Sequence, residues 1–208
     1  MGQIKKDIDN LSKEAGGKIK ARKTAEEWFD KASRSVKDNS VANHSKPFKV
    51  GMIHVFRYEK PKHIKTLEWW DMNPVVLALD PHDSGTDVGI NLNLLPVQVK
   101  EDLLDMIYDR MKGQIKSKAG RAKENNAITQ GQINLIYKDA VKFLRQYGFD
   151  YAIRQYIPQL KKNQKVVSYE SWAKIALCDF QDLNGVGINE VKKQFREHLK
   201  TRSKRKDI

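Results

Sequence analysis

Two acidic residues and a lysine near the C-terminus form the first pattern in this sequence that could do chemistry. Glu190 lies two residues before Lys192, and Asp182 lies eight residues before Glu190. Some metal-dependent nucleases combine carboxylates, which hold a divalent cation, with a nearby lysine. In those enzymes the lysine usually lies on a strand, whereas the apolar spacing around residue 190 predicts a helix. A nuclease is therefore an alternative and not the main interpretation.

Other catalytic and metal-binding patterns are missing from the sequence. The five histidines are scattered, and the only cysteine, Cys178, lies in an apolar run where we expect a buried, unreactive side chain. Residues 80–87 are rich in turn formers, and their carboxylates are expected to bond the local backbone. No phosphate-binding loop, dinucleotide motif or catalytic triad is present. We expect no enzyme activity, no catalytic residues, no metal and no cofactor.

Positive charge is the strongest signal. Lysine and arginine number 39 against 26 acidic residues, a formal net charge of +13, and such an excess attracts polyanions. The excess is concentrated in residues 112–123 and from residue 192 onward, with a weaker run at 18–23. No broad apolar face accompanies it, which favours nucleic acid over a membrane. The residues predicted to bind DNA are Lys112, Lys116, Lys118, Arg121, Lys123, Lys192, Lys193, Arg196, Lys200, Arg202, Lys204, Arg205 and Lys206.

Adjacent tryptophans offer a second kind of contact. Trp69 and Trp70 could stack on exposed bases at a DNA end, which contributes about 1–3 kcal/mol per base. The alternative is core packing, because two neighbouring tryptophans in a β-rich core must bury at least one ring.

The elements that position these residues change character along the chain. Residues 51–58, 73–79 and 88–94 alternate as strands do, with tight turns between them. A small flat sheet would leave its edges open, so we predict a small SH3-like or Sm-like β-barrel. Helical spacing precedes and follows it, which gives an α+β fold with flanking helices, a helical N-terminal arm and a basic C-terminal helix. The predicted parts are an arm at 1–45, the barrel with its following helix and a basic loop at 46–124, and a helical part packing on the barrel at 125–208.

Individual helix boundaries can also be predicted. Gly16 and Gly17 should break the first helix, and the capping-box pattern at 24–27 should open the second. Gly148 should end a helix, and Ser168 should cap the helix that holds Trp172.

Three segments together resemble a known family. Residues 51–58 contain a Phe-x-Tyr strand, residues 66–76 contain paired aromatics before Asp-x-x-Pro, and residues 88–96 contain Gly-x-Asn and end in Leu-Pro. Glu170 followed by Trp172 adds a later match. This order is similar to that in the DNA end protector family, head-neck virion proteins of T4-like tailed phages.

The resemblance implies a protein of the virion, present in the host cytoplasm during assembly, that covers the ends of packaged double-stranded DNA near the head exit. We predict contacts with the DNA backbone that do not depend on base sequence, and other virion proteins of the portal, neck or tail as partners. Two alternatives stay open. One is a structural neck, tail or baseplate component that does not bind DNA, and the other is a head-completion nuclease using the pattern around Glu190.

Overall fold

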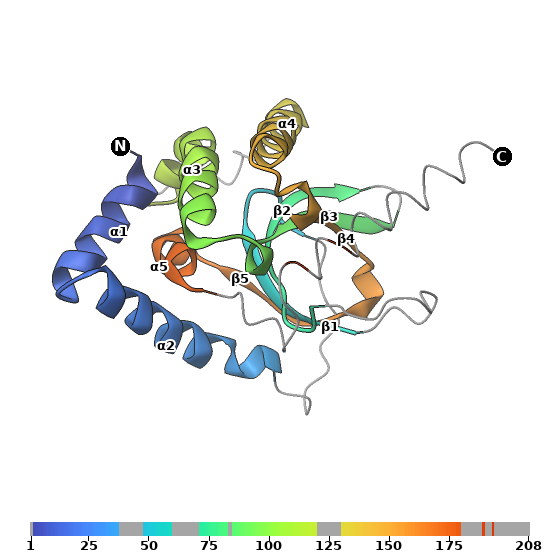
Figure 1. Ribbon diagram of the computed structural model, residues 1–208. Coiled ribbons are helices and arrows are strands. Elements are labelled where there is room, and N and C mark those ends of the chain that lie inside the picture. The colour runs from blue at the N-terminus through green and yellow to red at the C-terminus, as the bar shows by residue number, and fades with distance from the viewer. Residues whose placement is uncertain are drawn as a thin grey trace.

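The computed structural model describes residues 2–37, 48–59, 71–82, 85–119 and 130–179, together with residues 189 and 193. Its elements form an α+β fold, as the sequence predicts (Figure 1). The helices are α1 Gln3–Glu14, α2 Lys18–Lys37, α3 Val97–Ala119, α4 Gln130–Gln146 and α5 Trp172–Leu177, and the strands are β1 Ile53–Tyr58, β2 Val75–His82, β3 Thr86–Asn91, β4 Ile153–Tyr156 and β5 Lys161–Val167. Short 3₁₀ turns are η1 Leu92–Leu94, η2 Asp150–Ala152, η3 Pro158–Leu160 and η4 Tyr169–Ser171.

The strands form one antiparallel sheet in the order β4-β3-β2-β1-β5. The sheet is strongly rolled, because the ring centroids of Tyr58 in β1 and Tyr156 in β4 lie 5.2 Å apart although two strands separate β1 from β4. Three strand spacings in a flat sheet would separate them by about 14 Å. At the same opening, the Ile157 N–H donates to the Tyr58 hydroxyl at 3.1 Å. Rolling therefore brings the two sheet edges toward each other.

The rolled sheet stays open, which corrects the predicted SH3-like or Sm-like barrel. β4 pairs with β3, β5 pairs with β1, and the described strands show no pairing between β4 and β5. We predicted closure because it removes strand edges. The structure limits its edges differently, since β4 has only 4 residues and β5 carries Lys161, Lys162 and Lys165. Short, lysine-rich edge strands discourage pairing with another chain.

Each face of the sheet packs into a different core. The outer face carries Ile53, Leu77 and Ile90, which join the helices in the main hydrophobic core. The inner face carries Phe56, which packs with Phe48 in a smaller cluster inside the roll. The inner cluster has His54 and the buried Lys161 as neighbours of Phe48.

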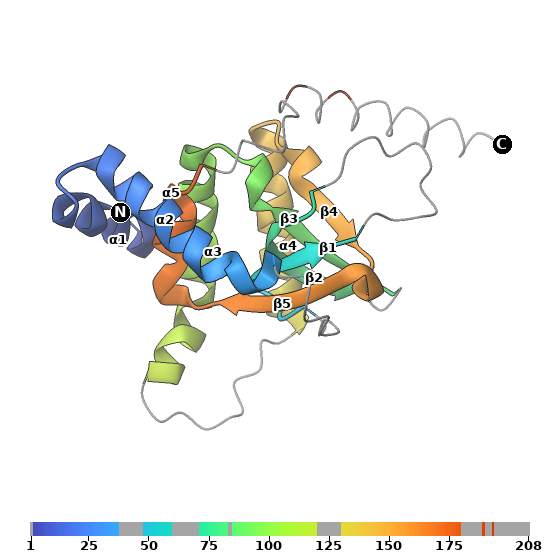
Figure 2. The same ribbon diagram turned by 90° about the horizontal axis from the view of Figure 1, so that it is seen from below.

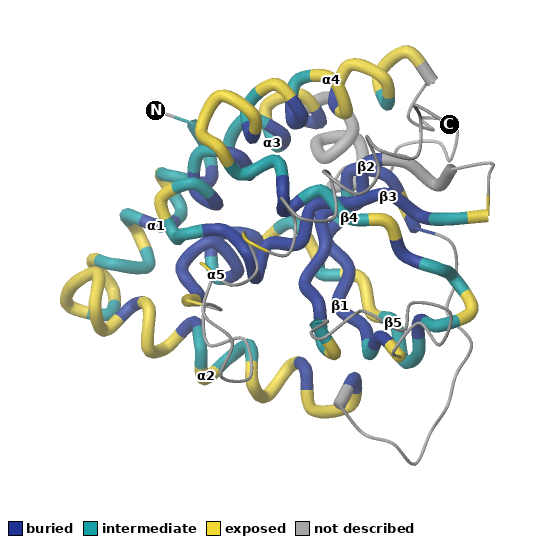
Figure 3. Tube along the Cα trace, turned by 45° about the vertical axis from the view of Figure 1, so that its right-hand side comes forward, coloured by how far each residue is buried: buried dark blue, intermediate teal, exposed yellow. Residues whose placement is uncertain are grey.

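The helices cover the outer face, with α5 in the middle. α5 contacts α1, α2 and α3, and Figures 1 and 3 show it enclosed between these helices and the sheet. Its Trp172 is fully buried. Ile4 and Ile8 of α1 are buried in the same core, so the N-terminal helices, which the sequence predicted as an arm, complete the main core.

Three predicted helix boundaries were wrong. Ser168 precedes the 3₁₀ turn η4 without a side-chain cap hydrogen bond, and Ser171 is the residue before α5. α2 begins at Lys18 and runs through the capping-box pattern, because Gly16 and Gly17, with φ of 75° and 129°, already complete the break. α3 continues to Ala119, so the first part of the predicted basic loop is helical. The end of α4 was predicted correctly, since Gly148 follows it with φ of 72°. Residues 38–47, between α2 and the sheet, and most of the predicted basic C-terminal helix lie outside the described residues.

None of the described helices combines the length and apolar character needed to cross a membrane.

Candidate nucleic-acid interface

Most of the DNA-binding residues predicted from the sequence lie outside the described part of the chain. Lys112, Lys116 and Lys118 are on the last turns of α3, and Lys193 is helical and exposed. The others, with the possible stacking residues and the nuclease pattern, fall outside it: Arg121, Lys123, Lys192, Arg196, Lys200, Arg202, Lys204, Arg205 and Lys206, Trp69 and Trp70, and Asp182 and Glu190.

A different group of basic side chains lies on the described core. Lys31 and Arg34 come from α2, Arg57 from β1, and Lys162 and Lys165 from β5. Arg57 and Lys162 are half-buried, and the other three are exposed. From Lys31 to the end of α2, and along β1 and β5, the sequence contains no aspartate or glutamate. We call these five residues the α2–β5 surface.

Strand register places three of these side chains on one side of the sheet. Arg57 lies directly opposite Lys162, and Val55 lies directly opposite Lys165. Val55 is buried in the main core on the outer face, and residues directly opposite each other in an antiparallel pair share a face. Arg57, Lys162 and Lys165 therefore all point to the side that the helices cover.

A β-bulge makes this arrangement possible. Lys162 and Lys165 are three residues apart in β5, and in a regular strand they would point to opposite faces. The register of β1 with β5 shifts between Val55 and Arg57, and Asn163 has a φ of 53°. The extra residue of a bulge re-aims the side chains around it. Both lysines thus reach the outer side, while Lys161 points inward.

Helix α2 ends beside this bulge. The Asn163 side-chain amide donates to the Val36 carbonyl oxygen at 3.5 Å, and Figure 2 shows α2 and β5 side by side. This surface was not predicted from the sequence. One signal for it was present, since residues 161–169 contain three lysines and no acid. The contributions of α2 and β1 could not be found that way, since only folding brings these distant segments together.

An ion pair lies buried inside the rolled sheet. Lys161 Nζ of β5 contacts the Asp87 carboxylate of β3, with 0% and 5% of the two side chains exposed. The same ammonium lies 4.0 Å from the ring centroid of Phe48. Burial lowers the pKa of Lys161, and the bond to Asp87 opposes that shift. The pair crosses the interior of the roll and helps to hold its two halves together.

His54 lies on the inner face with both ring nitrogens bonded. Nε2 lies 3.0 Å from the backbone nitrogen of Lys49, and Nδ1 lies 2.8 Å from the side-chain amide of Gln164. Partners at both ring nitrogens fix the orientation of the ring. Burial, aided by the charge of Lys161, lowers the pKa of His54 to about 4. The ring is therefore neutral near pH 7.

Asp71 fixes the chain where it rejoins the sheet directly after the tryptophan pair. Its carboxylate accepts from Asn91 Nδ2 at 2.9 Å, from Asn93 Nδ2 at 2.7 Å and from the Asn73 N–H at 3.1 Å. Burial raises the pKa of Asp71, and these hydrogen bonds oppose the shift. The attachment point of the predicted stacking residues is thus held at the end of β3.

A buried lysine joins α3 to the end of α5. Lys100 is fully buried, and its Nζ donates to the Cys178 carbonyl oxygen. Burial lowers the pKa of Lys100 to about 8, and it raises the pKa of the Cys178 thiol to about 12. Because only the thiolate is a good nucleophile, Cys178 is the buried, unreactive side chain that the sequence predicts.

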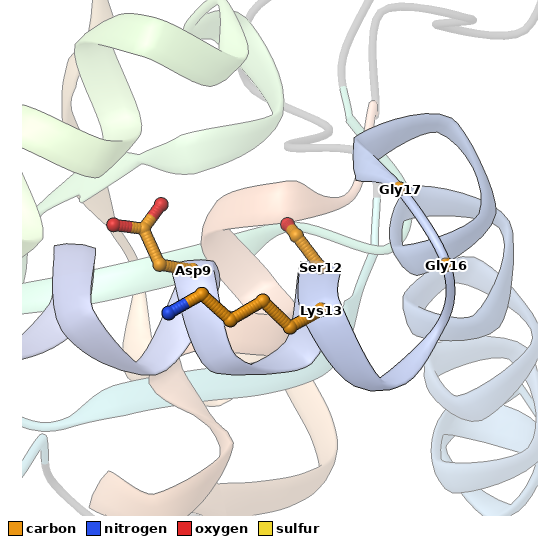
Figure 4. A pocket seen from close by; sticks show the side chains of 5 residues that line it. All are labelled: Asp9, Ser12, Lys13, Gly16 and Gly17. Carbon is orange, nitrogen blue, oxygen red and sulfur yellow. The ribbon is translucent and has the colours of Figure 1, made fainter.

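A surface depression lies at the turn between α1 and α2. Asp9, Ser12, Lys13, Gly16 and Gly17 line it (Figure 4). One acid and one lysine give it no preference for anions. Within the described ranges no group of three or more histidine, cysteine, aspartate or glutamate side chains could hold a metal ion.

Comparison with known proteins decides the family. A family model described as the phage T4 terminal DNA protecting protein matches residues 2–199. The chain belongs to this family. The resemblance carried by residues 51–96 is thereby confirmed. No curated protein and no solved structure matches the chain.

The residues that match the terminal DNA protecting family include most of the predicted basic sites. It covers α1 and α2, the whole basic segment at 112–123, and the tail as far as residue 199. Lys192, Lys193 and Arg196 fall inside the match. Five further cations of the predicted set lie beyond residue 199: Lys200, Arg202, Lys204, Arg205 and Lys206.

Proposed function

We propose that this protein binds the ends of double-stranded phage DNA and shields them from exonucleases, without itself being an enzyme. The observation that carries the proposal is the match to the terminal DNA protecting family over residues 2–199. The net charge of +13 supports it, because a phosphate polymer is the partner that such an excess attracts. Binding depends on backbone contacts, so it is independent of base sequence and steeply salt-dependent.

The basic segments are the proposed contacts with the DNA. Residues 112–123 and the tail from Lys192 to Lys206 supply cations for the phosphates, and Trp69 and Trp70 are the natural cap for the terminal base pair. Asp71 supports this last role because it anchors the chain next to them. In the virion we place the protein near the head exit, in contact with portal, neck or tail proteins.

End protection can be tested with one duplex in two forms. The purified protein is titrated with salt while bound to a linear duplex and to the same duplex closed into a circle, and exonuclease is added to both. We expect tighter binding to the linear form and intact termini. Equal binding without shielding would leave only general DNA binding. No binding near physiological salt would overturn the proposal in favour of a structural neck, tail or baseplate component.

The same assay tests the nuclease alternative. The non-enzymatic assignment would be overturned if the protein alone shortened the DNA in the presence of a divalent metal and Glu190→Ala abolished that cleavage. We expect the DNA to stay intact with and without Mg²⁺.

Neutralising part of the tail should weaken binding by a predictable amount. Replacing Lys204, Arg205 and Lys206 by glutamine removes up to three phosphate contacts, so the slope of log affinity against log salt should fall by about 3. The matched control replaces Lys138, Lys142 and Arg145 of α4, which are exposed, and should bind as the wild type does. Equal slopes for the tail variant and the control would exclude these tail residues from the interface.

A further inference from the structure

We propose that the α2–β5 surface is a second DNA contact, in which the folded core itself receives the phosphate backbone. The inference rests on the proposed DNA binding and deepens it, because it names a surface on the described fold in addition to the basic segments. The residues are Lys31, Arg34, Arg57, Lys162 and Lys165.

The charges on this surface are uncompensated within the described part of the chain. Arg57 and Lys162 lie directly opposite each other on neighbouring strands, and like charges in that position destabilise a sheet. None of the five side chains forms an ion pair with another described residue. Elsewhere exposed cations do find acids, as Lys5 does with Asp102 at 2.6 Å. A fold that gathers like charges without ion pairs to the described acids is suited to a partner that brings the negative charge.

The β-bulge shows that the arrangement is built into the strand. Without the extra residue at the bulge, Lys165 or Lys162 would point to the inner face. With it, the two lysines are about 10 Å apart on the same side, a distance comparable with the rise of about three base-pair steps along the DNA axis. Asn163, at the bulge, also bonds the Val36 carbonyl near the end of α2, so the last turn of α2, which carries Arg34, lies beside β5.

The composition of the surface favours DNA over an acidic protein. Protein interfaces have apolar or aromatic anchors at their centre and are depleted in lysine, whereas DNA interfaces are strongly positive. The exposed large apolar side chain nearest in the sequence is Val166. Val166 lies opposite His54 and therefore points to the inner face. The outer side presents cations without an apolar anchor among the described residues.

The test compares two charge-matched variants of the full chain. One replaces Arg34, Lys162 and Lys165 by glutamine, and the other replaces Lys138, Lys142 and Arg145, so each loses two lysines and one arginine. Binding to a linear duplex is measured over a salt series. We expect the α2–β5 variant to bind at least about tenfold more weakly and its salt slope to fall by about 3, while the α4 variant matches the wild type.

The outcomes separate this inference from the proposed function. A wild-type protein that does not bind DNA overturns both. If the wild type binds DNA and the α2–β5 variant has an unchanged salt slope, the inference alone is overturned. The same holds if the α2–β5 variant loses binding to virion proteins while its DNA binding is unchanged. If the triple variant does not fold, Lys165→Gln alone should lower the slope by about 1, and an unchanged slope in that folded variant also overturns the inference.

Discussion

Replacing Asp87 by alanine is expected to destabilise the protein by about 3–5 kcal/mol. The change leaves the ammonium of Lys161 inside the rolled sheet without its acidic partner, where its side chain is 0% exposed. An uncompensated buried charge costs far more than a lost surface contact. Urea denaturation followed by circular dichroism measures the difference in the free energy of unfolding.

Two further variants test the cause. Asp139→Ala removes the acid that Arg110 binds at 2.7 Å, but 48% of the Arg110 side chain is exposed, so the expected loss is about 0–1 kcal/mol. A double variant, Asp87→Leu with Lys161→Met, removes both buried charges and should recover most of the lost stability. If Asp87→Ala cost no more than Asp139→Ala, the idea that the inner pair is desolvated would be refuted.

The stability of the protein is expected to fall by about 3 kcal/mol as the pH drops from 6.5 to 4 because of His54 alone. The pKa of His54 is about 4 in the folded protein, against about 6.5 for an unperturbed histidine. Between pH 6.5 and pH 4, His54 binds a proton in the unfolded chain but not in the folded protein, so acid favours unfolding. The stabilisation is complete above pH 6.5 and is lost as the pH falls toward 4.

A His54→Gln variant isolates this contribution. Glutamine does not titrate, so the difference in unfolding free energy between wild type and variant should shrink steadily from pH 7 to pH 4. Asp71 acts in the opposite direction, since burial raises its pKa and the folded state then gains stability as the pH falls. Both proteins contain Asp71, so the difference between them still reports His54. Parallel pH profiles for wild type and variant would show that His54 binds a proton as readily in the folded protein as in the unfolded chain, which contradicts the lowered pKa.

The central strands could be predicted from the sequence because burial on both faces of the sheet leaves a dense apolar pattern. β1, β2 and β3 follow from such runs. β5 could not be predicted in full, since an edge strand needs little apolar alternation and its first residues are lysine and amide side chains. Only Val166 and Val167 indicated it. The start of α2 was misplaced because a capping pattern also occurs inside helices, where its side chains simply face solvent.

The candidate site divides in the same way. A run of like charges, such as residues 112–123, is visible in the sequence and predicts a polyanion contact before any fold is known. The α2–β5 surface joins residues from Lys31 to Lys165, and it depends on strand register and on one bulge. Such a surface is visible only once the chain has folded.

The pairing of β1 with β5 and the packing of α1 and α2 on α5 have a consequence for synthesis on the ribosome. The chain emerges with its N-terminus first. Ile53 is therefore synthesised well before its strand partner Val167, and Ile4 well before the helix that contains Trp172. Until α5 has left the ribosome, α1, α2 and α3 lack the helix around which they pack. We expect this protein to complete its fold only after α5 has left the ribosome, and a chain that stops before residue 172 to remain unfolded.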